Sequence, residues 1–234
     1  MTRIPKGRPA RNSGCFRYVF VCFFVALKVN APRAANIVAA YRGRIMIKKE
    51  NAMLRITEIK KEDMPVSNWS GGSTTEIMIF PKGARYADRE FLFRISTAQV
   101  ELESSDFTSL PDYLRVIASL EGELELTHTL RCGELKKRII PLETVHYFDG
   151  SLPTHCVGRA RDLNLMLKKG AADGELRFVE DGEWVAQSLN ANEFALVYSI
   201  ESGNARFAEA DEDDVLVFAS EGRTALFTVK LTDF

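Results

Sequence analysis

The sequence predicts an all-β protein, and three observations carry the prediction. Short runs rich in β-branched and aromatic residues recur along the chain, several with alternating apolar and polar positions. Turn signals separate these runs, such as Gly-Gly at residues 71–72, Asp-Gly at 149–150 and Ser-Gly at 202–203. Segments with helical periodicity are few. Many strands at short spacing indicate a sandwich or a barrel.

The expected strands follow one another with little between them. Residues 54–59 (LRITEI) show an amphipathic strand pattern, and residues 75–80 (TEIMIF) form a denser apolar run. Residues 115–120 (RVIASL) and 123–127 (ELELT) flank a Glu-Gly turn signal. The remaining expected strands are 91–95, 99–102, 138–140, 163–167, 176–179, 194–199, 215–219 and 225–231.

The charge distribution separates the first 52 residues from the rest. Residues 1–52 hold eleven Lys and Arg against one acid, whereas residues 53–234 hold 20 against 31. Three interpretations of residues 1–52 compete: an over-long gene start before Met53 or Met46, a signal or anchor built on the apolar run 18–29, and a structured extension. The apolar run is too short for a membrane span. We favour the first interpretation, in which these residues are not part of the fold.

The cysteines favour a cytoplasmic protein. Cys15, Cys22, Cys132 and Cys156 are scattered, and no pair has the two-residue spacing of a zinc knuckle or a redox motif. Reduced, structural cysteines are the simplest interpretation, as in a cytosolic chain.

Several classes of site lack their sequence signals. The histidines His128, His146 and His155 form no His-x-His or His-x-x-x-His pair and have no carboxylate at ligand spacing, so we expect no metal. No phosphate-binding or dinucleotide-binding glycine pattern and no Gly-x-Ser-x-Gly motif occurs, so no cofactor is expected. The acidic body disfavours a nucleic-acid groove.

Six fragments of the sequence carry a resemblance to a known family through their order and spacing. They are residues 68–76 (NWSGGSTTE), 93–98 (FRISTA), 105–111 (SDFTSLP), 115–122 (RVIASLEG), 148–150 (FDG) and 162–166 (DLNLM). Together they resemble the HutD family, whose other branch is called Ves. A departure occurs in the first fragment, where the family's frequent Asn-Gly-Gly-Gly is Trp-Ser-Gly-Gly and places Trp69 and Ser70 beside the expected pocket.

The resemblance implies a double cupin, with two small β-barrels or jelly-roll halves in one chain, and no settled catalytic activity. We expect the first barrel at residues 53–160 and the second half at 161–234. In metal-binding cupins a glutamate precedes the glycine of the first motif; counted back from Gly122, this slot falls on Arg115. The second-motif histidine, counted from Gly150, falls on Pro153. A cation in a metal-ligand slot repels a metal and attracts a carboxylate or phosphate.

Strand alternation selects the first candidate ligand-binding residues. If Phe93 and Ile95 pack outward, Arg94 points into the barrel, where a guanidinium needs an acid or an anion. Ser96 shares the face of Arg94 and is alternatively a strand serine bonded to backbone. Glu76 is an internal partner of Arg94 or, alternatively, a proton acceptor.

Four further residues complete the candidate set. Arg115 is the second cation, and Asp162 and Asn164 share one strand face that lines another part of the pocket. Asp162 alternatively caps a turn. Trp69 is either a ligand-stacking wall or packing. His128 is interpreted as an exposed or hydrogen-bonded residue at the edge of an apolar strand.

Two functions remain open at this point. The first is a protein that senses or buffers a small anionic metabolite, a carboxylate, with Arg94 and Arg115 as anchors. The second is a metal-independent enzyme acting on a small carboxylate, with Glu76 or Asp162 as general base. We expect a small-molecule partner, no nucleic acid and, for the folded body, no membrane. A homodimer is left open.

Overall fold

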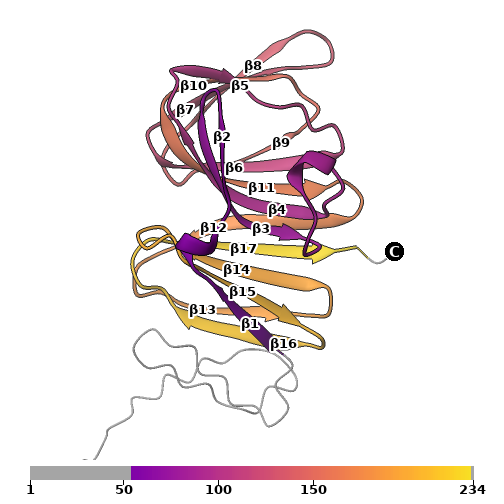
Figure 1. The fold of residues 1–234 in the computed structure, drawn as a ribbon, viewed down its shortest axis with the longest axis vertical. Coiled ribbons are helices and arrows are strands. Elements are labelled where there is room, and N and C mark those ends of the chain that lie inside the picture. The colour runs from indigo at the N-terminus through magenta and orange to yellow at the C-terminus, as the bar shows by residue number, and fades with distance from the viewer. Residues whose placement is uncertain (1–53, 233–234) are drawn as a thin grey trace, which may run out of the picture. The chain divides into compact units, whose positions relative to one another are not determined.

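The computed structural model describes residues 54–232, in which strands follow one another almost without interruption (Figure 1). The predicted all-β class is confirmed, whereas the interpretations of residues 1–52 lie outside the described residues. Among the described residues, no helix has the length and hydropathy needed to cross a bilayer. The elements are β1 (Leu54–Ile59), η1 (Lys61–Asp63), β2 (Val66–Trp69), β3 (Gly72–Phe80), η2 (Tyr86–Asp88), β4 (Phe93–Val100), β5 (Ser104–Asp106), β6 (Tyr113–Glu121), β7 (Leu124–Thr129), β8 (Leu135–Ile140), β9 (Val145–Asp149), β10 (Thr154–Val157), β11 (Ala160–Lys168), β12 (Ala172–Val179), β13 (Trp184–Leu189), β14 (Glu193–Ser199), β15 (Ala205–Ala210), β16 (Asp214–Ala219) and β17 (Thr224–Leu231).

The strands form four antiparallel sheets that stack as layers (Figure 1). A six-stranded sheet, in the order β2-β3-β4-β11-β6-β9, carries a four-stranded sheet, β5-β10-β7-β8, on one face. Its other face packs on a five-stranded sheet, β1-β15-β14-β17-β12. The two-stranded sheet β13-β16 covers the far face of the five-stranded sheet.

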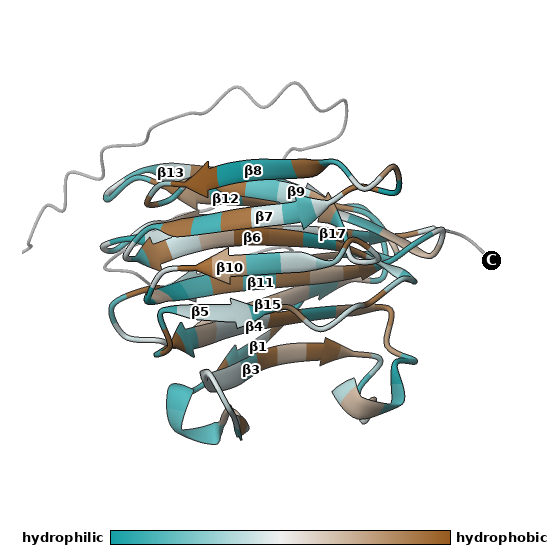
Figure 2. Cartoon of the chain, turned by 90° about the horizontal axis from the view of Figure 1, so that it is seen from above, coloured by the Kyte–Doolittle hydropathy of each residue, from teal (hydrophilic) through white to brown (hydrophobic). Residues whose placement is uncertain are grey.

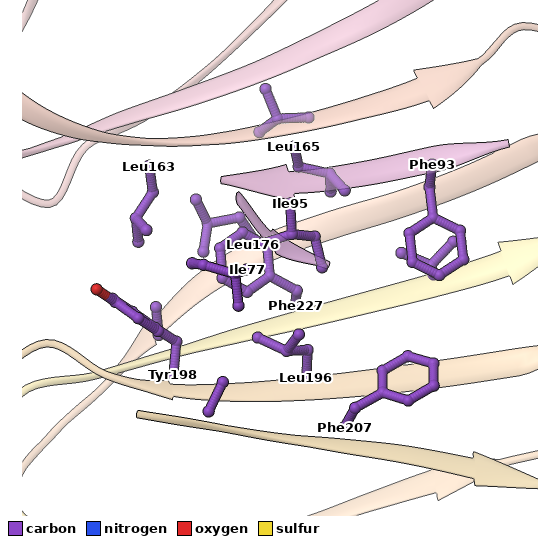
Figure 3. Close-up of a cluster of buried hydrophobic side chains, with 14 of the residues drawn as sticks. Ile77, Phe93, Ile95, Leu163, Leu165, Leu176, Leu196, Tyr198, Phe207 and Phe227 are labelled. Carbon is purple, nitrogen blue, oxygen red and sulfur yellow. The ribbon is translucent and has the colours of Figure 1, made fainter. Parts of the chain in front are cut away.

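The largest hydrophobic core lies between the six-stranded and five-stranded sheets (Figure 3). Phe93 is fully buried there, with its ring stacked on Phe80 at 5.1 Å between centroids and tilted against Phe194 at 5.5 Å. Phe194 in turn stacks on Phe207 at 5.6 Å. Other core members from the two sheets are Ile77, Ile95, Leu163, Leu165, Leu176, Leu196 and Phe227.

The sheets do not follow the expected boundary between residues 160 and 161. Strand β11 crosses this boundary and pairs with β4 and β6 in the middle of the six-stranded sheet. Strand β1, from the start of the described chain, pairs with β15 in the five-stranded sheet. Residues 161–168 therefore lie with the strands of the first half, and residues 54–59 with those of the second.

The two halves differ in what lies on their inner faces. Between the five-stranded and two-stranded sheets lies an apolar cluster, with Val185, Leu216 and Phe218 facing Val197 and Leu226, and the buried polar side chains nearby are hydroxyls. The face of the six-stranded sheet toward the four-stranded sheet instead carries buried arginine, aspartate and asparagine side chains. This polar face is where the candidate residues gather.

Candidate functional site

Alternation along β4 decides which way Arg94 points. Phe93 and Ile95 belong to the core shared with the five-stranded sheet, so Arg94 and Ser96 project to the opposite face. In the register of the sheet, Ser96 lies opposite both Glu76 of β3 and Asn164 of β11. The structure thus meets the condition set from the sequence, in which Arg94 points inward when its two neighbours pack outward.

Six of the seven predicted residues share this face, and we call them the arginine cluster. Glu76 is contributed by β3, where the register shifts between Glu76 and Met78. Alternation places Ile77 in the apolar core and Glu76 on the polar face, and the irregularity brings Met78 to the core side as well, opposite Ile95. The cluster consists of Glu76, Arg94, Ser96, Arg115, Asp162 and Asn164.

Arg94 is held by an acid, a hydroxyl and an aromatic ring. Its side chain is 5% exposed, and Nε donates to Glu76 Oε2 at 2.7 Å. Nη1 donates to Ser96 Oγ at 3.2 Å. The guanidinium carbon lies 4.4 Å from the ring centroid of Tyr86 in η2. The internal ion pair with Glu76 is one of the two alternatives expected from the sequence.

Arg115 is less completely satisfied. Its Nη2 donates to Asn164 Oδ1 at 2.9 Å, and Asn164 Nδ2 donates to Asp162 Oδ1. The guanidinium carbon lies 4.6 Å from the ring centroid of Phe107 and 5.2 Å from that of Phe148. Arg115 Nε is buried and has no hydrogen-bond partner among the described residues, which leaves a costly orphan donor.

Burial shifts the pKa values of two cluster members toward their neutral forms. Burial lowers the pKa of Arg115 to about 10, with neighbouring Arg94 adding to the effect. Burial raises the pKa of Asp162 to about 7, although Arg115 and the backbone N–H of Ala98 oppose the change. Asp162 is therefore only partly ionised at neutral pH, and the cluster carries an excess of positive charge.

Trp69 is the predicted residue that stands apart from the arginine cluster. It ends β2, is 40% exposed, and donates from Nε1 to Thr74 Oγ1 at 3.2 Å within its own hairpin. This hairpin requires glycine at both Gly71 and Gly72 of the Trp-Ser-Gly-Gly motif. A Cβ on Gly71 would meet the indole ring at 2.0 Å, and a Cβ on Gly72 would meet Gln99 O at 1.9 Å, where φ is also positive.

The predicted site residues did not include the aromatic and histidine side chains that lie around the arginine cluster. Tyr86 lies in the three-residue helix η2, which is too short for any periodicity to mark a buried face. Phe148 was quoted only as part of a motif, yet its ring lies beside Arg115 and 4.8 Å from that of His128. Of the two alternatives expected for His128, the structure shows the hydrogen-bonded one: the residue is buried, and its Nε2 lies 3.0 Å from His146 Nε2. The alternation of Leu124, Leu126 and His128 was the signal for this inward position.

Outside the arginine cluster, the described residues include a pocket in the second half. Between residues 54 and 232, no group of three or more His, Cys, Asp or Glu side chains is placed to hold a metal ion. A pocket of about 330 Å³ lies in the second half, between β12, β13, β14 and β17. It contains none of the predicted residues. Its acids are partly satisfied, since Lys230 Nζ lies 3.2 Å from Glu193 Oε1.

Comparisons with known proteins agree with the sequence resemblance and the fold. The HutD family model matches residues 61–231. No functionally curated protein matches the sequence. A conserved protein of unknown function, PA5104 from Pseudomonas aeruginosa PAO1, is 21% identical with a TM-score of 0.64, covering 76% of this chain and all of its own. HutD from Pseudomonas fluorescens SBW25 is 23% identical with a TM-score of 0.62 and the same coverage.

A third solved structure supports the predicted fold. The pirin YhhW from Escherichia coli, solved in complex with nickel(II), is 12% identical with a TM-score of 0.54, covering 76% of this chain and all of its own. At these identities the likeness concerns the fold alone. The predicted cupin fold is therefore confirmed as a fold.

Proposed function

Because the chain belongs to the HutD family, we propose that it binds a small carboxylate within the arginine cluster, anchored by Arg94 and Arg115 and without a metal. One observation carries the proposal: Arg115 is 6% exposed, yet its Nε has no acceptor. A carboxylate oxygen placed there supplies the missing acceptor and a countercharge.

The charges of the cluster support an anionic ligand. The cluster contains two guanidiniums and two acids, Glu76 and Asp162. The pKa of Asp162, about 7, leaves this acid partly neutral, so the positive charges are not fully offset. A bound carboxylate offsets the excess positive charge in a medium of low dielectric constant. It also favours protonation of Asp162, so binding strengthens as the pH falls toward and below 7.

The hydrogen bonds of the two cluster acids favour binding over catalysis. Glu76 accepts from Arg94, and Asp162 accepts from Asn164. A general base needs access to the proton that it removes, whereas these carboxylates are occupied by neighbouring donors. Glu76 and Asp162 are therefore assigned to holding the arginines in place.

We predict that losing either arginine weakens carboxylate binding. Acetate, lactate and succinate are titrated into the wild type by calorimetry, and the tightest of them into Arg94→Met and Arg115→Met. Each variant is expected to lose about tenfold to more than a hundredfold in affinity, because one charge-assisted hydrogen bond contributes about 1.5–3 kcal/mol. NMR spectra of the mixtures show whether any product forms.

Arg85→Met is the matched control, because Arg85 pairs with Asp88 on the surface, at 2.8 Å, outside the cluster. Unchanged affinity in folded Arg94→Met and Arg115→Met, or an equal loss in Arg85→Met, contradicts the proposal. Accumulating product would replace it with the enzymatic alternative.

We also predict that binding does not depend on a metal. Protein treated with a chelator and then dialysed is expected to bind the same carboxylate with unchanged affinity, because both anchors are guanidiniums, which do not ligate metal ions. Calorimetry before and after treatment measures this. Restoration of lost affinity by one equivalent of a transition metal would refute the prediction.

A further inference from the structure

Two strands of the first half each leave one backbone edge unpaired. Strand β8 is the last strand of the four-stranded sheet, and β9 is the last strand of the six-stranded sheet. They are consecutive in the chain but belong to different sheets. Lys136 lies opposite His128 across β7 and β8, and Arg138 lies opposite Leu126. Both basic residues are therefore on the inward face of β8.

We call Lys136, Arg138 and His146 the seam. Figure 2 shows the middle of β8 as one of the most hydrophilic strand segments in this view. Lys136 and Arg138 pair with no carboxylate among the described residues. Arg138 Nη1 donates only to the neighbouring Lys137 O, at 3.1 Å. On the opposite face of β8, Lys137 does pair with an acid, Glu125, at 2.7 Å. The seam cations thus lack a countercharge that their neighbour has.

The hydrogen bonds of His128, which lies next to the seam, determine which of its two ring nitrogens carries the proton. The Thr154 hydroxyl donates to Leu152 O at 3.0 Å, so it accepts from His128 Nδ1 at 2.8 Å. The neutral ring of His128 then presents an unprotonated Nε2. The 3.0 Å contact requires His146 Nε2 to donate to it. His146 Nδ1 is then unprotonated, and it has no hydrogen-bond partner among the described residues.

A proton therefore enters the pair most easily at His146 Nδ1, because no existing hydrogen bond has to break. In the absence of a ligand, the groups around the two histidines disfavour this protonation. Burial and then Arg138 and Lys136 lower the pKa of His146, and burial, His146, Lys136, Arg138 and Arg115 lower that of His128 to about 4. The charged groups near the pair on β6 and β8 are the cations Arg115, Lys136 and Arg138, and β10 contributes the Thr154 hydroxyl and the Cys156 thiol.

We propose that the seam is a second anion-binding site, separate from the arginine cluster, which takes a divalent oxyanion such as a sulfate or phosphate group and gains a proton at His146 when it is filled. The anion offsets Lys136 and Arg138, and protonated His146 adds a third donor. A tetrahedral dianion suits a site with three neighbouring cations better than a monocarboxylate does.

The chain contains three histidines, so NMR can follow each imidazole separately. Sodium sulfate is titrated at constant ionic strength against sodium chloride, and the pKa of each histidine is measured. We expect sulfate to raise the pKa of His146 by about one unit, a tenfold change in proton affinity. His155, which pairs with Asp106 outside the seam, serves as the internal reference.

The variant Lys136→Gln/Arg138→Gln changes two exposed side chains and is expected to abolish the sulfate-induced shift. The matched control Lys137→Gln, on the opposite face of the same strand, is expected to retain it. Arg94→Met is expected to retain it as well, even if this variant no longer binds carboxylates, so the two proposals fail independently.

Three results would overturn the seam proposal. The first is an equal sulfate shift at His146 and His155, and the second is an undiminished shift in Lys136→Gln/Arg138→Gln. The third is a shift lost in Arg94→Met but kept in the double variant, which places the sulfate in the arginine cluster. An acetate shift equal to that of sulfate would overturn the preference for a divalent anion.

Discussion

Replacing Asp162 with Asn is expected to remove about 4 kcal/mol of pH dependence from the free energy of unfolding between pH 4 and pH 7.5. Asp162 is 2% exposed and its pKa is raised from 3.8 to about 7, mainly by burial. A difference of about three pKa units between unfolded and folded chains corresponds to about 4 kcal/mol. Urea unfolding of wild type and Asp162→Asn across this pH range measures the effect.

The sign follows from which state binds the proton more tightly. The folded pKa of Asp162 is above the unfolded value, so its contribution to stability is fully present below about pH 4. The contribution is lost as the pH rises through 7. His128 has the opposite effect, because its lowered pKa makes the fold lose stability as the pH falls from about 6.5 to 4. Subtracting the variant curve from the wild-type curve removes this second contribution.

The control for this prediction is Asp173→Asn, which changes an exposed aspartate on β12. It is expected to leave the pH dependence close to that of the wild type. If Asp162→Asn and Asp173→Asn give the same curve, Asp162 is ionised in the fold at ordinary pH. The partial neutrality assigned to the arginine cluster would then be wrong.

Dense apolar runs made several strands predictable from the sequence. Strands β6, β11, β14 and β17 contain several buried aliphatic or aromatic residues each, and β3 has buried Ile77 beside partly buried Met78, Ile79 and Phe80. The sequence did not predict β2, β5, β9, β10, β13 or β15. For β5 and β10 the reason is that SSD and THCV carry too few apolar residues to show a pattern. Their conformation depends on pairing with each other and with β7.

Strand alternation is what allowed the sequence to predict which candidate residues share a face. Arg94, Ser96, Asp162 and Asn164 follow from the period of two, once one face of the six-stranded sheet is known to be apolar. The seam was not predicted, because it depends on β8 and β9 separating into different sheets. No local pattern contains that information, and only the pairing of β7 with β8 places Lys136 beside His128.

Replacing Phe93 with Ala is expected to destabilise the protein by about 3–5 kcal/mol while leaving unfolding a single transition. Phe93 is fully buried and contacts Phe80 in its own half and Phe194 in the five-stranded sheet. Truncating a buried phenylalanine removes its burial energy and leaves a cavity. Because the largest core lies between the two sheets, both halves are expected to lose stability together.

The two tryptophans of the chain report the two halves separately. Trp69 is in β2 and Trp184 is in β13, so Trp184→Phe and Trp69→Phe each leave one fluorescent reporter. In the Phe93→Ala background, coincident urea midpoints for the two reporters are expected. A midpoint that falls only for Trp69 would mean that the first half unfolds by itself. The core between the sheets would then not couple the two halves, and the strand exchange by β1 and β11 would not be enough to make them one folding unit.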